Sequence, residues 1–355
     1  MSLKDHLLTR IAQDGPMSVA DYMAECLLHP KYGYYSTRDP LGAQGDFITA
    51  PEISQMFGEL IGLSLAQCWL DQGQPERFTL AELGPGRGTL MADILRATHG
   101  VAGFHDAADI VLLDASPTLR DIQAQTLRDH APQWIDTVAD LTDAPLFLVA
   151  NEFFDALPIR QFLRHGDGWR ERLIGADSES LAFGLGPQAA QVALAGRLED
   201  TNDGDLVEIC APAIPIMTVI AGHIARHGGA GLIVDYGDWH SLGDTLQALQ
   251  SHDRTDPLAT PGQADLTAHV DFEPLATTIR TTGCAHTRLT PQGVFLERLG
   301  ITARAQALAA PLGGSELDRL IAAHRRLTHP EEMGNLFKVL GLYPALAAPP
   351  PGLEP

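Results

Sequence analysis

The sequence predicts an α/β protein with a mostly parallel sheet that is covered by helices on both faces. From about residue 78, short apolar segments alternate with helical patterns, and this alternation is typical of a parallel sheet. The first apolar segment runs directly into a glycine-rich turn, and a last one, residues 335–342, follows near the end of the chain. The 355 residues, of which 45% are hydrophobic, are enough for a large core with additions.

Helices are expected before the sheet. Residues 3–29 carry two apolar stripes at helical spacing, and Ser18, with Asp21 three residues later, marks the start of the second helix. A glycine-rich, aromatic loop then leads to another helix, over about residues 52–71. We therefore expect residues 1–75 to form a helical N-terminal extension that includes this loop.

The alternation that follows predicts the strands and helices of the core. Apolar segments predict strands at residues 78–82, 110–114, 135–138, 146–150 and 232–235. Helical spacing predicts helices over residues 90–97, 117–130 and 213–227. Alternating apolar residues on either side of Gly166 and Gly168 predict a β-hairpin insertion near residues 159–185.

These elements suggest a division of the rest of the chain into three parts. A Rossmann-like core is expected over residues 76–240. Residues 241–330 are expected to form an inserted subdomain that contacts the substrate, although residues 238–272 are polar and loop-rich and show no clear periodicity. Residues 331–355 would then supply the last core strand and a tail.

The composition restricts the classes of function and of location. A formal net charge of −21 argues against binding along a nucleic-acid backbone. No apolar run approaches the roughly 20 residues of a membrane-spanning helix, so we expect no membrane insertion. The cysteines form no CxxC pair, which argues against a zinc site and suggests a reducing compartment. The chain is therefore predicted to be cytoplasmic and without a bound metal. The four cysteines are Cys26, Cys68, Cys210 and Cys284.

The glycine-rich turn favours one cofactor. The first predicted strand ends at Glu82 and runs into Gly84, Pro85, Gly86 and Gly88, whose glycines allow a tight turn and a close approach of a ligand. A dinucleotide fingerprint needs a further glycine where this chain has threonine, and the Gly-Lys-Ser/Thr triplet of a P-loop is absent. The pattern Glu-x-Gly-x-Gly-x-Gly is that of S-adenosylmethionine (SAM) methyltransferases. This cofactor has no phosphates, so a carboxylate beside its sulfonium and ammonium groups is tolerable.

A second carboxylate supports this cofactor. Asp114 ends the next predicted strand, where an acidic side chain can accept both ribose hydroxyls. We also predict that Ser116, just after that strand, and Thr49, in the N-terminal loop, contact SAM. Gly and Asp are common in ordinary turns, and it is their combination after two successive strands that favours SAM.

The end of the fourth predicted strand is where the methyl acceptor is expected. It carries Asn151, Glu152 and Asp155 with two phenylalanines between the carboxylates, and it lacks the prolines of adenine-N6 methyltransferases. Two carboxylates can hold the planar fork of a guanidinium and keep its charge on the outer nitrogens. Asn151, Glu152 and Asp155 are therefore the predicted catalytic residues, and the alternative is that Asn151 and Asp155 only cap a loop.

Three functions remain open at this point. The leading hypothesis is a protein-arginine N-methyltransferase that acts on a partner protein. The others are a SAM-binding assembly chaperone with incidental catalysis and a small-molecule methyltransferase, which would favour a closed apolar pocket.

Five segments of the chain resemble the MidA-type methyltransferases. They are residues 45–59, 82–90, 151–158, 235–237 and 262–272, and the first and last are far more specific than the glycine turn. Asp114 departs mildly from the family pattern, where a glutamate is expected, but it keeps the carboxylate.

The resemblance implies a class I methyltransferase fold with a helical N-terminal extension and an inserted subdomain. In mitochondria, the family includes an assembly factor of respiratory complex I that dimethylates an arginine of the subunit beside the quinone pocket. A protein substrate of this kind is thus implied by the resemblance alone, and the oligomeric state stays open.

Overall fold

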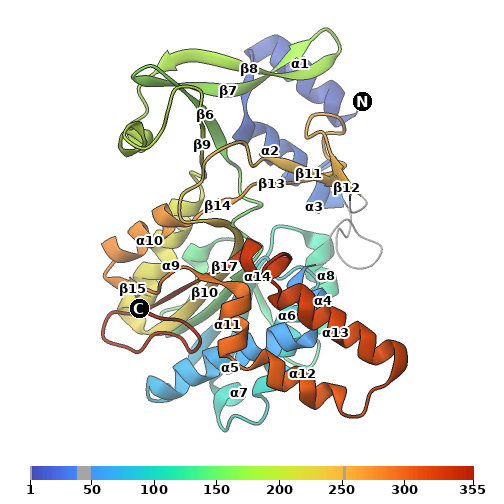
Figure 1. Ribbon diagram of the computed structural model, residues 1–355, viewed down its shortest axis with the longest axis vertical. Helices are drawn as coiled ribbons and strands as arrows, with labels where there is room; N and C mark the ends of the chain where they lie inside the picture. Colours follow the sequence, from blue (N-terminus) through green and yellow to red (C-terminus); the bar gives the residue numbers. More distant parts are fainter. Residues whose placement is uncertain (1, 38–48, 251–252) are drawn as a thin grey trace.

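The computed structural model describes residues 2–37, 49–250 and 253–355 and places a central sheet below a smaller layer of helices and strands (Figure 1). The order of the central sheet is β15 (Cys284–His286), β17 (Phe337–Pro344), β10 (Gly229–Asp238), β5 (Leu146–Asn151), β2 (Phe78–Leu83), β3 (Ala108–Leu113) and β4 (Gln133–Ile135). Strands β2 to β5 and β10 pair in parallel, whereas β17 returns antiparallel to β10. The predicted α/β fold is confirmed.

The strand order reverses next to β2. The chain proceeds outward from β2 through β3 to β4, and it then comes back to add β5 on the opposite side of β2. Ligands of open parallel sheets bind outside the carboxyl ends of the strands at such a reversal. Glu82 lies near the end of β2 and Asn151 ends β5, so the topology brings both to this position.

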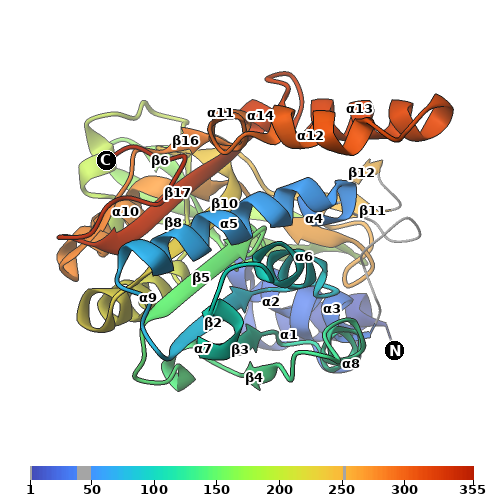
Figure 2. The same cartoon turned by 90° about the horizontal axis from the view of Figure 1, so that it is seen from below.

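Helices cover both faces of the sheet (Figure 2). One face packs against α5 (Gln55–Asp71), α6 (Thr89–Thr98) and α7 (Phe104–Ala107), and the other against α9 (Ala213–His227) and α10 (Phe272–Thr281). All residues of β2 and β5 are buried, as expected for strands with helices on both sides. Among the residues described, no helix combines the length and the apolar character needed to cross a lipid bilayer.

The upper layer is built from segments that are distant in sequence (Figure 1). Helices α1 (Leu3–Asp14) and α2 (Val19–Leu28) share a buried apolar cluster with β7 (Gly168–Asp177), β8 (Ser180–Ala189), β11 (Gln247–Gln250) and β13 (Asp265–Thr267). Strand β12 (Asp253–Thr255) pairs with β11 and completes the small sheet of this layer. Strands β1 (Met17–Ser18), β6 (Arg160–His165) and β9 (Leu206–Ile209) complete the larger, five-stranded sheet of this layer. The hairpin predicted near residues 159–185 therefore carries a third strand.

Several predicted elements are found with shifted ends. Ser18 accepts a hydrogen bond from the backbone of Asp21, which confirms it as the cap of α2. The helix predicted over 52–71 is divided at Ser54, which caps α5 and ends the short α4 (Ala50–Ile53). Strand β4 begins at Gln133 and ends at Ile135, so only the first residue of the predicted 135–138 belongs to it. The strand stops there because Thr137 caps a 3-10 turn that takes the chain out of the sheet.

Residues 241–330 contribute to both layers. Strands β11, β12 and β13 belong to the upper layer, whereas α10 packs on the central sheet. Helices α11 (Gln292–Arg298), α12 (Ile301–Ala309) and α13 (Gly314–Thr328) follow on the side of α5. The division at residues 75, 240 and 330 remains a prediction. Residues 45–48, which begin the first family segment, lie outside the described part of the chain.

Candidate functional site

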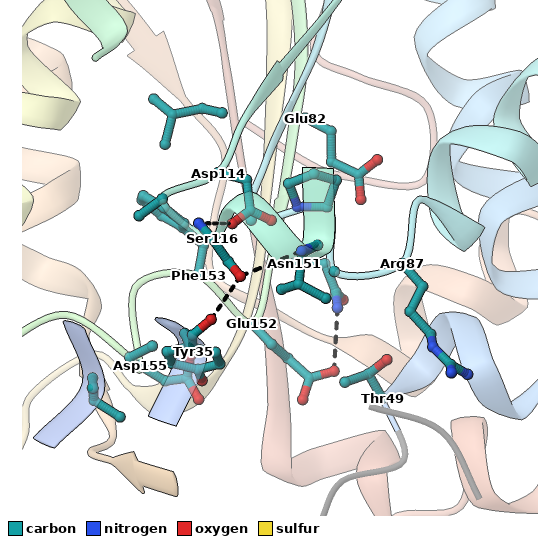
Figure 3. A pocket seen from close by; sticks show the side chains of 18 of the residues that line it. Tyr35, Thr49, Glu82, Arg87, Asp114, Ser116, Asn151, Glu152, Phe153 and Asp155 are labelled. Atoms are coloured by element: carbon teal, nitrogen blue, oxygen red, sulfur yellow. Dashed lines mark hydrogen bonds between the residues drawn. The ribbon is translucent and has the colours of Figure 1, made fainter. Parts of the chain in front are cut away.

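A cavity lies between the two layers, at the carboxyl ends of β2, β3 and β5 (Figure 3). Its volume, taken as the space that the centre of a water molecule can occupy, is about 310 Å³. Every site residue predicted from the sequence lines it except Gly88. The predicted residues in the lining are Thr49, Glu82, Gly84, Pro85, Gly86, Asp114, Ser116, Asn151, Glu152 and Asp155.

The glycine turn needs its glycines for conformational reasons. Gly84, Gly86 and Gly88 have φ angles of +64°, +54° and +81°, which side chains disfavour. At Gly84, a Cβ atom would also lie 3.1 Å from the ring of Phe153. Gly88 is the left-handed N-cap of α6, so its part is to turn the chain from the loop into the helix.

Glu82 is a buried carboxyl group. Its side chain is 2% exposed, and one carboxylate oxygen has no hydrogen-bond partner among the described residues. Burial raises its pKa to about 8 and the charge of Asp114 adds to this, while the backbone N–H of Met91 opposes it. A buried acceptor of this kind is suited to a ligand that brings a donor or a positive charge, and SAM brings both.

Asp114 is oriented by two donors. Its Oδ1 accepts the backbone N–H of Ser116 at 2.8 Å, and its Oδ2 accepts Nε2 of Gln123 at 2.7 Å. Burial raises the pKa of Asp114, and these two bonds oppose the rise. Each carboxylate oxygen has a second lone pair, so both can still accept a hydroxyl group of a ribose.

Ser116 connects the core to the upper layer. Its hydroxyl donates to the backbone oxygen of Tyr35 at 2.6 Å and accepts the N–H of Leu119 at 3.3 Å, which caps helix α8 (Pro117–Thr126). The hydroxyl is thus used within the protein, and Ser116 positions the loop beside Asp114 (Figure 3).

Glu152 combines an unusual backbone with a half-buried carboxyl group. Its φ is +52°, a conformation that costs free energy for any residue but glycine and is often found at functional sites. Its Oε1 accepts Nδ2 of Asn151 at 3.2 Å and the N–H of Ala50 at 3.4 Å. Burial raises its pKa to about 8, and the charge of Asp155 adds to the rise.

Asp155 lies beside Glu152 in the same cavity. One of its carboxylate oxygens is buried without a hydrogen-bond partner among the described residues. Burial raises its pKa to about 6, against the effect of the Tyr236 hydroxyl. The turn that carries it is held by Asp235, whose Oδ2 accepts the backbone N–H groups of Phe154 at 3.0 Å and Asp155 at 3.2 Å.

Four residues of the site were not among those predicted: Tyr35, Gln123, Asp235 and Asp265. Tyr35 and Asp265 line the cavity from the upper layer, and the Tyr35 hydroxyl donates to both carboxylate oxygens of Asp265, at 2.9 and 3.0 Å. The only sequence signals were the aromatic loop and the family segments 235–237 and 262–272. Gln123 lies in no such segment.

Comparisons with known proteins agree on one family. Residues 60–290 match a family described as "Putative S-adenosyl-L-methionine-dependent methyltransferase". The protein arginine methyltransferase NDUFAF7, mitochondrial, of Xenopus laevis is 38% identical over 97% of this chain and 84% of its own length. The human protein of that name is 37% identical, over 96% of this chain and 82% of its own.

A solved structure is also similar over most of the chain. It is a protein from Burkholderia thailandensis whose crystal structure holds S-adenosyl-homocysteine. The two share 28% sequence identity with a TM-score of 0.83, and the match covers 96% of this chain and 91% of the other.

Proposed function

Because this chain belongs to the MidA-like family of SAM-dependent methyltransferases, we propose that it methylates arginine side chains of a partner protein. The resemblance predicted from the sequence is confirmed, and so are methyl transfer as the activity and SAM as the cofactor. The acceptor, the partner and the roles of individual residues make up the proposal.

The proposed cofactor position follows from the shape and charge of the cavity. Glu82 and the turn with Gly84, Pro85, Gly86 and Gly88 hold the methionine part, where positive charge meets the buried carboxyl group. Asp114 accepts the ribose hydroxyls and Ser116 orients it, while Thr49 contacts the cofactor from the opposite wall (Figure 3).

One observation carries the choice of an arginine acceptor: the cavity is acidic. Among the described residues, six carboxyl groups line it, against one guanidinium, that of Arg87. The six belong to Glu52, Glu82, Asp114, Glu152, Asp155 and Asp265. Burial and mutual repulsion raise the pKa of Glu152, so a cation in the cavity would stabilise its ionised form. An arginine side chain supplies that cation together with a planar set of donors.

The residues at the end of β5 have distinct parts in the proposed reaction. SAM supplies a methyl group that its sulfonium activates toward a nucleophile. Glu152 and Asp155 pair with the outer nitrogens of the guanidinium and leave the target nitrogen directed at the methyl group. Asn151 donates to Glu152 and orients it. Glu152 or Asp155 accepts the proton that the methylated guanidinium loses.

The partner protein and the cellular location are the last two parts of the proposal. The NDUFAF7 relatives are named as protein arginine methyltransferases, which supports a protein substrate, and a core subunit of respiratory complex I is the proposed partner. The same relatives are named as mitochondrial. The cytoplasmic location that the composition predicts for this chain differs from that of these relatives, and it stays a prediction.

The test is to incubate the purified protein with methyl-labelled SAM and an extract of cells that lack it, and to identify the labelled product by mass spectrometry. We expect label on arginine side chains of one or few proteins. A parallel incubation with Glu152→Gln controls for background. Label that depends on Glu152 but resides on a small molecule or on another residue type would overturn the proposed acceptor.

A further inference from the structure

The side chain of Gln123 is fully buried (0% exposed), although it does not itself line the cavity. It projects from α8 toward the glycine turn and the strands β3 and β4. A buried amide has to be hydrogen-bonded to be tolerated, and this one contacts three different elements of the core.

The orientation of the amide is unambiguous. Nε1 of Trp134 lies 2.7 Å from Oε1 of Gln123, and an indole can only donate, so the amide oxygen has to face it. The amide nitrogen then faces two acceptors, the backbone oxygen of Gly86 at 2.8 Å and Oδ2 of Asp114 at 2.7 Å. Both of its hydrogens are therefore used.

Two parts of the cavity wall that are distant in the sequence are held together by this one side chain. Oδ2 of Asp114 is held by Gln123 and Oδ1 by the N–H of Ser116, which sets the plane of the carboxylate. The same nitrogen holds the carbonyl of Gly86 in the turn. The position of the turn relative to Asp114 thus depends on the amide.

We propose that Gln123 is a positioning residue for SAM, which sets the distance and orientation between the glycine turn and the ribose-binding carboxylate. The inference rests on the proposed placement of the ribose on Asp114. Because the amide reaches the cofactor only through these two groups, its loss weakens SAM binding and leaves the chemical step intact at saturating SAM.

The first test replaces Gln123 by methionine, which has a similar length but cannot bond to either acceptor. We expect the Kd for SAM and for S-adenosyl-homocysteine, measured by calorimetry, to rise on the order of tenfold or more, as for lost bonds to a charged group. The kcat at saturating SAM should stay within about twofold, since the acceptor residues are untouched.

Trp134→Phe is the matched control. It removes the indole donor and leaves both bonds from the Gln123 nitrogen in place, so the Kd for SAM should change by less than about threefold. If Gln123 only supported packing around β4, the two variants would lose affinity and thermal stability in parallel, and the proposal would be wrong.

A second variant, Gln123→Glu, tests the positioning role of Gln123 if Gln123→Met does not fold. In Gln123→Glu the introduced carboxyl group can donate to Asp114 or Gly86 only while it is protonated. The negative charge of Asp114 and burial both raise the pKa of that group. We therefore expect the affinity of this variant for SAM to recover as the pH falls from 8.5 to 6, relative to the wild type at each pH.

A pH-independent ratio of the two affinities would overturn the proposal. Failure of the ribose placement has a different signature, because Asp114→Ala would then leave the Kd unchanged. A large loss in Asp114→Ala together with a normal Kd in Gln123→Met would remove only the role of Gln123.

Discussion

At the scale of single residues, Glu152 has two features that each cost free energy. A left-handed backbone at a residue other than glycine costs on the order of 1–3 kcal/mol, and burial next to Asp155 disfavours its charge. The N–H of Glu152 donates to the backbone oxygen of Val234 at 2.9 Å, and Asn151 and Ala50 donate to its side chain. These bonds hold a conformation that the local sequence does not favour.

We predict that Glu152→Gln lowers methyl transfer by orders of magnitude and leaves the affinity for SAM nearly unchanged. The amide keeps the shape but loses the charge, and its NH₂ group would face the donors of the guanidinium. Turnover and calorimetry measure the two effects. Asp155→Asn should act in the same direction, but less severely.

Glu179→Gln, at an exposed position in the turn between β7 and β8, is the matched control and should be fully active. Near wild-type turnover in Glu152→Gln would rule out arginine as the acceptor.

The raised pKa values of Glu152 and Asp155 predict a pH dependence of both activity and stability. Because an ionised pair has to meet the cation, kcat/KM should fall as the pH drops through about 8 and again through about 6. A raised carboxyl pKa stabilises the fold below the ordinary value of 4.5, and this contribution is lost as the pH rises through about 8.

Without ligands, Glu152→Gln should therefore melt at a higher temperature than the wild type at pH 8.5, and the difference should vanish near pH 4. A difference in melting temperature that stays constant across this pH range would contradict the raised pKa of Glu152.

At the scale of elements, the glycine turn is the most constrained part of the chain. Gly84, Gly86 and Gly88 are all left-handed, and such a turn can only be filled by residues that tolerate positive φ. Gly86→Val should therefore abolish detectable SAM binding, since a branched side chain is strained at this positive φ and Gly86 lines the cavity. Calorimetry should show no heat while circular dichroism stays native.

Gly184→Val in β8 is the control for this substitution, because no other atom lies within 4 Å of its Cβ position and its φ is not positive. Retained binding in Gly86→Val would show that the cofactor does not approach this turn.

The other half of the proposed cofactor site follows β3. Asp114→Ala should weaken SAM binding by about 1.5–3 kcal/mol, the range for hydrogen bonds to a charged acceptor, with the fold retained. Asp121→Ala, on the exposed side of α8, should leave the Kd unchanged. If both variants bind alike, another acidic residue holds the ribose.

The sequence predicts an element best where a strong local pattern of residues defines it. The strong periodicity of residues 213–227 predicted α9 with both ends correct, and the motif of the glycine turn predicted its position at the end of β2. The strands of residues 247–267 have three or four residues each and alternate weakly, so they are defined by pairing rather than by their own pattern.

The same limit applies to the site. Tyr35 and Asp265 meet across 230 positions of the chain, which no local pattern encodes. A glutamine on an amphipathic helix is normally exposed, so nothing in the sequence distinguishes Gln123.

At the scale of the whole molecule, the cavity exists only where the two layers meet. The core supplies the strand ends, and the upper layer supplies α2, Tyr35 and Asp265. Tyr35 contacts both sides: its backbone oxygen accepts the Ser116 hydroxyl, and its own hydroxyl donates to Asp265. Tyr35 therefore connects Ser116 with Asp265, and we assign Asp265 to the proposed acceptor side of the cavity.

Tyr35→Phe should separate these two contacts. The backbone bond to Ser116 is kept, so the Kd for SAM should stay within about threefold, whereas Asp265 loses a donor and the KM for the protein acceptor should rise on the order of tenfold. Steady-state kinetics with each substrate varied measure both. A change confined to SAM would place Asp265 with the cofactor instead.

The hydrogen bond between Trp134 and Gln123 gives the protein an internal optical probe. The chain has four tryptophans, and among the bonds described, Trp134 is the one whose indole N–H is joined through a single amide to the carboxylate of Asp114. Indole emission responds to the strength of this bond and to nearby charge. Binding of a cationic nucleoside at Asp114 is thus expected to change the wavelength or intensity of the Trp134 emission, which would allow the kinetics of cofactor entry to be followed by stopped-flow fluorescence without a label.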